Sequence, residues 1–231
     1  MCIRDSVLPG GGSIPAVDAT LSKKAREAGQ HIVDLARNDI KPRDLITKNV
    51  LLNAIMVDMA IAGSTNAVLH ILSIANELEL DVTMEDFDRL SNEIQCICGV
   101  MPSGPFTITD YYQNGATPLL MKALESKLHL KEPALVGGTW GEVLARVDGS
   151  SLNGSDGVIR GLDNPFYNKP GLKVLKGNLS EGGAIVRPVS YTHLLCDRRI
   201  KHDRNKNHDG ITGADAHRFL GCDRKKLAAR R

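Results

Sequence analysis

Apolar and polar residues alternate with a helical period through the first half of the chain. Residues 19–39 are predicted to form an amphipathic helix, because apolar side chains recur three and four positions apart. Pro42 marks the end of this segment. The apolar face consists of Ala25, Ala28, Ile32, Leu35 and Ala36.

The next segment, residues 45–61, is apolar on nearly every side, which predicts a buried helix. Asp58 is the one acid inside this run, and we expect it to be a buried polar group. A break at Gly63 ends the helix, and Ser64 opens a third helix that extends to about residue 78.

Two further helices are predicted at residues 84–92 and 117–128. Thr83 is expected to cap the first, and two acidic residues follow in its first turn, where the helix dipole favours negative charge. The segment between the two helices contains two prolines and a glycine within residues 102–105, which predicts a turn.

From residue 158 the pattern changes to short apolar runs separated by Gly, Asn and Pro, which is typical of β-strands. The candidate strands are residues 158–160, 172–175 and 184–186, and the glycine-rich loop 149–157 marks a domain boundary before them. Three short strands are too few to build a core of their own, so we expect the body to be cut off at its C-terminal side.

The composition is that of a soluble globular protein, with 42% hydrophobic and 24% charged residues, and not that of a disordered or fibrous chain. No run reaches the roughly 18 apolar residues of a membrane span, so we expect no membrane association. Five unevenly placed cysteines do not make a disulfide scaffold, which favours a reducing, cytoplasmic location.

Charge divides the chain unequally. Residues 194–231 contain eleven Lys/Arg and five Asp, a balance of +6, so the first 193 residues carry −4 of the total of +2. A basic tail is either a solvated, disordered segment or a nucleic-acid arm. Phe219 is the only aromatic residue among its basic residues, so we do not expect nucleic-acid binding.

One DNA sequence can encode the two segments that flank residues 7–188. Codons for residues 1–6, read on the opposite strand, encode residues 189–193. This DNA sequence resembles the transposon end used to prepare sequencing libraries. We therefore expect both segments to be adapter-derived and exclude them from reasoning about the fold. Residues 7–188 then form the body, and residues 194–231 form a tail unrelated to it.

The first residues of the third helix are the candidate site. Ser64, Thr65 and Asn66 begin this helix, and a helix N-terminus with hydrogen-bonding side chains can receive a carboxylate or phosphate. Asn66 also starts a polar stripe that continues through His70, Ser73 and Glu77. The alternative is ordinary capping by Ser64 or Thr65, with His70 as a hydrogen-bonded core histidine.

Cys96 and Cys98 form a lone Cys-x-Cys pair. A metal site needs more ligands, and residues 7–188 contain no other cysteine. We interpret the two as small buried hydrophobic residues and expect no metal ligand, cofactor ligand or catalytic residue in this part of the protein.

Four short strings resemble the dihydroxy-acid dehydratase and 6-phosphogluconate dehydratase family, and their order and spacing also match. Within this family, the chain is most similar to the dihydroxy-acid dehydratases. The strings are DMAIAGSTNAVLH at 58–70, PSGPF at 102–106, GLDNPF at 161–166 and VLKGNL at 174–179. The resemblance covers residues 7–188. It implies an α/β fold, seen here as an α+β piece: the end of an N-terminal α/β domain (7–150) followed by the first strands of a C-terminal β-barrel-like domain (158–188).

The resemblance also implies a chemistry. Family members are hydro-lyases that dehydrate small 2,3-dihydroxy acids, of the 2,3-dihydroxyisovalerate type in branched-chain amino-acid biosynthesis, to 2-keto acids. They use an iron–sulfur cluster and Mg²⁺, whose ligands the resemblance places outside residues 7–188, as it does the catalytic serine. It places Ser64, Thr65 and Asn66 near the substrate pocket, and it implies a homodimer for the full-length protein.

Two alternatives to this function stay open. In one alternative, the parent protein is a sugar-acid or 6-phosphogluconate dehydratase. In the other, the body is a non-enzymatic scaffold whose basic tail binds nucleic acid. If the parent protein is a dihydroxy-acid dehydratase, we expect this chain to be an internal fragment that is inactive by itself.

Overall fold

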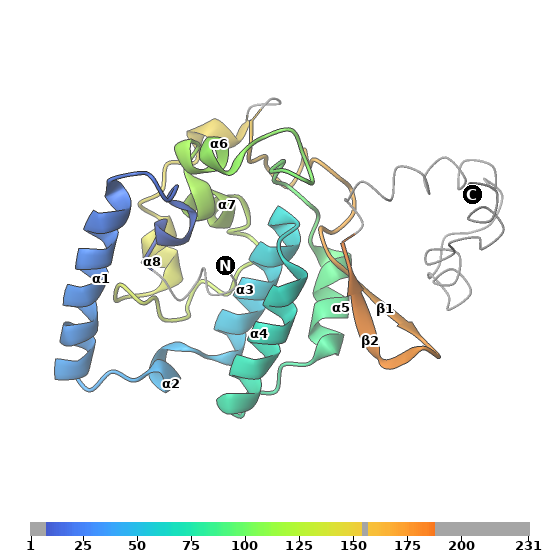
Figure 1. Cartoon of the computed structure of the whole chain (residues 1–231), viewed down its shortest axis with the longest axis horizontal. Coiled ribbons are helices and arrows are strands. Elements are labelled where there is room, and N and C mark those ends of the chain that lie inside the picture. The colour runs from blue at the N-terminus through green and yellow to red at the C-terminus, as the bar shows by residue number, and fades with distance from the viewer. Residues whose placement is uncertain (1–7, 154–156, 188–231) are drawn as a thin grey trace, which may run out of the picture.

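The computed structural model describes residues 8–153 and 157–187 (Figure 1). The expected adapter segments and the basic tail lie outside these residues, as does part of the expected boundary loop. The elements are η2 (Gly11–Ser13), α1 (Thr20–Arg37), α2 (Pro42–Leu45), α3 (Lys48–Ile61), α4 (Thr65–Glu77), α5 (Met84–Glu93), α6 (Ile108–Gln113), α7 (Ala116–Ala123), α8 (Trp140–Leu144), η3 (Ser150–Asn153), β1 (Lys173–Gly177) and β2 (Ser180–Val186).

Helix α3 is the centre of the core. It lies against α4, α5 and α7, and nine of its residues are buried, which confirms the prediction of a buried helix. Its one fully buried polar side chain, Asn53, donates to the backbone carbonyl of His129 at 3.2 Å and accepts the His129 N–H at 2.8 Å. This pair of bonds satisfies the buried amide and fixes the loop after α7 against α3.

A sharp corner joins α3 to α4. Ala62 ends α3 with a left-handed backbone (φ 51°), and the Gly63 N–H donates to the carbonyl of Asp58 at 2.9 Å. A Cβ added to Gly63 would lie 1.9 Å from a carboxylate oxygen of Asp58, so a side chain does not fit there without a shift. The glycine at position 63 therefore leaves room for the Asp58 carboxylate at this corner.

The end of α3 also receives two distant segments. The carbonyl of Ala60 accepts the N–H of Ile97, and the carbonyl of Met59 accepts the N–H of Gly171, both at 3.0 Å. The segment around Ile97 in turn pairs with the later chain through the bridges Cys96–Tyr167 and Cys98–Ile159. The predicted strand at 158–160 is thus reduced to an isolated bridge, because its neighbour pairs with it at only one position.

The two other predicted strands are confirmed as an antiparallel hairpin, in which β1 pairs with β2 and Val174 lies opposite Ile185. The hairpin rests on α5 (Figure 1). Lys173 of β1 donates to Ser91 at 3.0 Å and to Asn92 at 2.6 Å on α5. A mixed helical structure with a small sheet agrees with the expected α/β class. A barrel-like domain after residue 158 remains a prediction.

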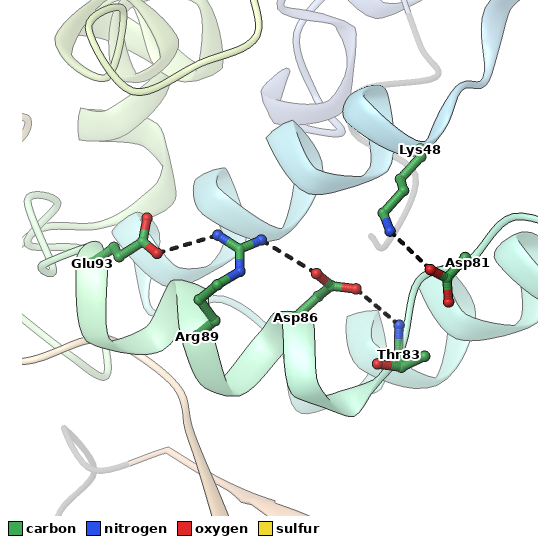
Figure 2. A network of polar contacts seen from close by, with 6 residues as sticks. All are labelled: Lys48, Asp81, Thr83, Asp86, Arg89 and Glu93. Atoms are coloured by element: carbon green, nitrogen blue, oxygen red, sulfur yellow. Dashed lines mark hydrogen bonds and ion pairs between the residues drawn. The ribbon is translucent and has the colours of Figure 1, made fainter.

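Polar side chains shape α5 along its exposed side (Figure 2). The Thr83 N–H donates to Asp86 at 3.2 Å, which confirms the predicted start of the helix, and Arg89 pairs with both Asp86 and Glu93 at 3.2 Å. Exposed pairs of this kind stabilise a fold by about 0.2–1 kcal/mol each. They therefore support the helix locally and do not decide the position of α5.

Two short helices, α6 and α8, were not predicted, and α7 ends at Ala123, five residues before the predicted end. Thr107 caps α6 and Thr139 caps α8, and each shares a capping box with an acid three residues later. That Thr-x-x-Asp/Glu pattern is a signal in the sequence for a helix start. Their apolar runs are too short to show a helical period.

Helix α1 forms as predicted, and its apolar face is largely exposed. Ala25, Ala28 and Ala36 are exposed, and Ile32 is 62% exposed. The edge that meets the rest of the described residues is a polar one, where His31 hydrogen-bonds the carbonyl of Leu135. Periodicity identifies an apolar face, but the neighbour that covers it is a tertiary property.

Replacing Gly63 tests the corner, and Gly29 in the middle of α1 is the matched control. Gly63→Ala is expected to lower the free energy of unfolding by about 1–3 kcal/mol, because the new methyl group overlaps the Asp58 carboxylate. Gly29→Ala meets no atom within 4 Å and should be neutral or stabilising by up to about 1 kcal/mol. Urea denaturation followed by circular dichroism measures both, and equal effects would contradict the proposed corner geometry.

Candidate functional site

Ser64, Thr65 and Asn66 form the first turn of α4 at the protein surface. The Ser64 hydroxyl accepts the Asn66 N–H at 3.2 Å, and its carbonyl accepts the Ala67 N–H at 2.9 Å. Thr65 and Asn66 are exposed, and Ser64 is half-buried. Capping by Ser64 is therefore confirmed, and the side chains of the other two residues point to a solvent-accessible face.

The polar stripe on α4 lies on the same exposed face. His70 is exposed, so the expectation of a core histidine at this position is wrong. The buried side of α4 is formed by its small and branched residues. The polar stripe lies away from this buried side. Those buried residues are Ala67, Val68, Ile71 and Ala75.

Two charged residues, Asp58 of α3 and Arg187 after β2, interact electrostatically. Asp58 is half-buried, and its carboxylate covers Gly63. Arg187, which directly follows β2, donates to the hydroxyl of Ser103 at 3.1 Å. Burial lowers the pKa of Arg187, while the negative charge of Asp58 opposes that shift. The guanidinium group thus lies within electrostatic range of the Asp58 carboxylate.

Ser103 belongs to a closed turn that the sequence predicted at residues 102–105. The turn is held by two bonds, from the Met101 N–H to the Phe106 carbonyl at 2.8 Å and from the Phe106 N–H to the Gly99 carbonyl at 3.1 Å. Tyr167 donates from its hydroxyl to the Ser103 carbonyl at 2.8 Å. Ser103 is buried to 1% exposure, so its hydroxyl is a fixed acceptor for Arg187.

Arg160 lies on the aromatic side of the same turn. Its guanidinium carbon is 3.8 Å from the centre of the Phe166 ring, and Phe166 packs edge-to-face on Phe106. This cation–π contact helps to hold residues 160–166 against the turn. Reasoning from the sequence missed both arginines. Arg160 stands at the end of a predicted strand, and no local pattern distinguishes Arg187.

Cys96 and Cys98 are both buried, as the sequence predicted for small hydrophobic residues. The Cys96 thiol donates to the Cys98 carbonyl at 3.5 Å, and burial raises the pKa of Cys96 to about 11.

Within residues 8–153 and 157–187, no three His, Cys, Asp or Glu side chains are grouped so that they could hold a metal ion. No helix of this described part is long and apolar enough to cross a membrane.

Comparison with known proteins identifies relatives along most of the chain. It is 40% identical over 183 residues to a dihydroxy-acid dehydratase of Methanoregula boonei, which covers 79% of this chain and 32% of that protein. The corresponding enzyme of Halothermothrix orenii is 39% identical over 194 residues, covering 83% and 34% of the two chains. The chain therefore spans about a third of the length of the curated relatives it matches.

A family-level comparison agrees with these relatives. Residues 6–143, more than half of the chain, match the family described as dihydroxy-acid/6-phosphogluconate dehydratase, N-terminal. The matched region contains the α3–α4 corner, Ser103 and both buried cysteines. The chain therefore belongs to the dihydroxy-acid/6-phosphogluconate dehydratase family of hydro-lyases.

Proposed function

We propose that these residues are part of a hydro-lyase that converts a small 2,3-dihydroxy acid, of the 2,3-dihydroxyisovalerate type, to a 2-keto acid. The observation that carries this proposal is family membership together with relatives whose names are dihydroxy-acid dehydratase. A role in branched-chain amino-acid biosynthesis and a cytoplasmic location follow from the same proposal. So does a homodimer for the full-length protein.

The first turn of α4 is the proposed substrate contact within this chain. A substrate of this class carries a carboxylate, and the N-terminus of a helix presents a positive partial charge to such a group. Thr65 and Asn66 are exposed there, whereas Ser64 is engaged in capping. Their role is to bind and orient the acid end of the substrate.

The family's iron–sulfur cluster and Mg²⁺ supply the Lewis-acid chemistry on the leaving hydroxyl and the carboxylate. The residues described here do not fit either group. Both cysteines are buried, and within the described residues no three His, Cys, Asp or Glu side chains are grouped so that they could hold a metal ion. We therefore assign no step on this chain to the cluster or the metal, and we propose that the 231 residues alone do not dehydrate the substrate.

A chimera tests the proposed function. The matching segment of the Methanoregula boonei relative is replaced by residues 7–188 of this chain, and dehydration of 2,3-dihydroxyisovalerate is measured. The chimera is expected to be active, and Asn66→Ala should lower its kcat/KM about tenfold, because a contact to the substrate is lost. Asn76→Ala, at the exposed far end of α4, is the matched control and should leave kcat/KM unchanged.

Each part of the proposal can fail separately in this experiment. An active chimera that dehydrates only sugar acids would contradict the substrate class. Equal losses in the two asparagine variants would contradict the site. Turnover by the isolated 231-residue chain would contradict its proposed inactivity.

Thiol labelling tests the assignment of the cysteines. Because the pKa of Cys96 is raised from 9.0 to about 11, its thiolate fraction at pH 8 should be about a hundredfold below that of a free thiol. The peptide containing Cys96 and Cys98 is expected to stay unmodified by iodoacetamide in the folded chain and to react fully in guanidinium chloride. Rapid labelling of the folded chain, measured by mass spectrometry, would show reactive thiols instead.

A further inference from the structure

Helix α1 turns an apolar stripe to solvent. None of its 18 residues is buried, and Ile32, in the middle of the stripe, is 62% exposed. The members of the stripe recur three and four positions apart, so they lie along one side of the helix. We call this surface the outer stripe, and it consists of Leu21, Ala25, Ala28, Ile32 and Ala36.

The side of α1 that faces the rest of the described chain is polar. Lys24, Glu27 and His31 are half-buried there. Lys24 pairs with Glu27 at 2.8 Å, and His31 hydrogen-bonds the carbonyl of Leu135. An amphipathic helix gains most of its stability when its apolar side packs against other elements. The described residues do not supply that packing for the outer stripe.

The position of Leu8, the first described residue, indicates which segment could supply it. Leu8 and Pro9 line an open hollow together with residues of α1, among them Lys24 and His31. At the opposite end of the described structure, Arg187 follows β2, far from α1 (Figure 1). Chain that precedes Leu8 therefore leaves beside α1, whereas chain that follows Arg187 leaves far from it.

We propose that the outer stripe is the docking surface for an apolar segment of the parent protein that precedes residue 7. The matched regions are 32% and 34% of the two relatives compared above, so about two thirds of each has no counterpart here. A segment long enough to cover the stripe is therefore available in proteins of this family. This inference rests on the proposed function only for the statement that the chain is part of a longer dehydratase.

Thiol labelling at the outer stripe compares the 231-residue chain with the chimera described above. Residues 20–37 contain no cysteine, so Ile32→Cys places a single thiol in the stripe. Labelling of its peptide by iodoacetamide, followed by mass spectrometry, is expected to be about a hundredfold slower in the chimera, because the preceding segment covers the stripe there. Ala28→Cys, which changes the volume less, should show the same protection.

Lys23→Cys is the matched control. Lys23 is exposed and lies nine positions before Ile32, about two and a half turns, so it is on the opposite side of α1. Its thiol should react at similar rates in both proteins. If the large chimera does not fold, the same thiols are placed in the relative with residues 20–37 alone replaced. Equal labelling of Ile32→Cys in the 231-residue chain and in the folded longer protein would overturn the proposal.

A photoreactive diazirine amino acid in place of Ile32 identifies the occupant. In the chimera, the cross-linked peptide is expected to come from the relative's part that precedes the matched segment. A peptide from the part that follows, or from a second copy of the protein, would overturn the proposal. The labelling needs no substrate, so an inactive chimera with a protected thiol would contradict the proposed function and still support the docking.

Discussion

The structure depends on how the carbonyl groups at the end of α3 find their hydrogen-bond donors. A helix leaves its last carbonyls without partners inside the helix, and at the buried end of α3 water cannot supply them. Ile97 donates to Ala60, and Gly171 donates to Met59 in addition to the local Ala62 N–H. These two bonds join three parts of the chain that are far apart in sequence, and they bring the region after residue 158 onto the helical core.

The close packing of these segments also explains the two glycines near the corner. Gly171 comes so near that an added Cβ would lie 2.2 Å from the Cα of Ala62, and Gly63 is kept free of a side chain by Asp58. Once these backbones are in contact, the chain can turn sharply into α4 and present Thr65 and Asn66 on the surface. The hairpin that follows Gly171 then brings Arg187 to Ser103. The α3–α4 corner and the docking of the later chain therefore meet at the end of one helix.

Local sequence signals predicted much of this structure. The buried α3, the start of α4 at Ser64 and the start of α5 at Thr83 follow from apolar patterns and capping residues, which act within a few positions. The exposure of the apolar face of α1 and the exposure of His70 could not be predicted, because both depend on which neighbours are present. The hydrogen bond of Arg187 to Ser103 depends on the docked hairpin and leaves no local signal. The family resemblance, in contrast, is carried by short strings, two of which lie at the corner and the turn.

The central claim is that the end of α3 is closed by the amides of Ile97 and Gly171. Native-state hydrogen exchange of these two amides, measured by NMR as urea is added, tests it most directly. We predict that both are protected as strongly as the buried amides of α3 and lose protection together with them, as members of one cooperative unit. Exchange of Ile97 and Gly171 at the rate of exposed amides, while α3 stays protected, would contradict this description of the fold.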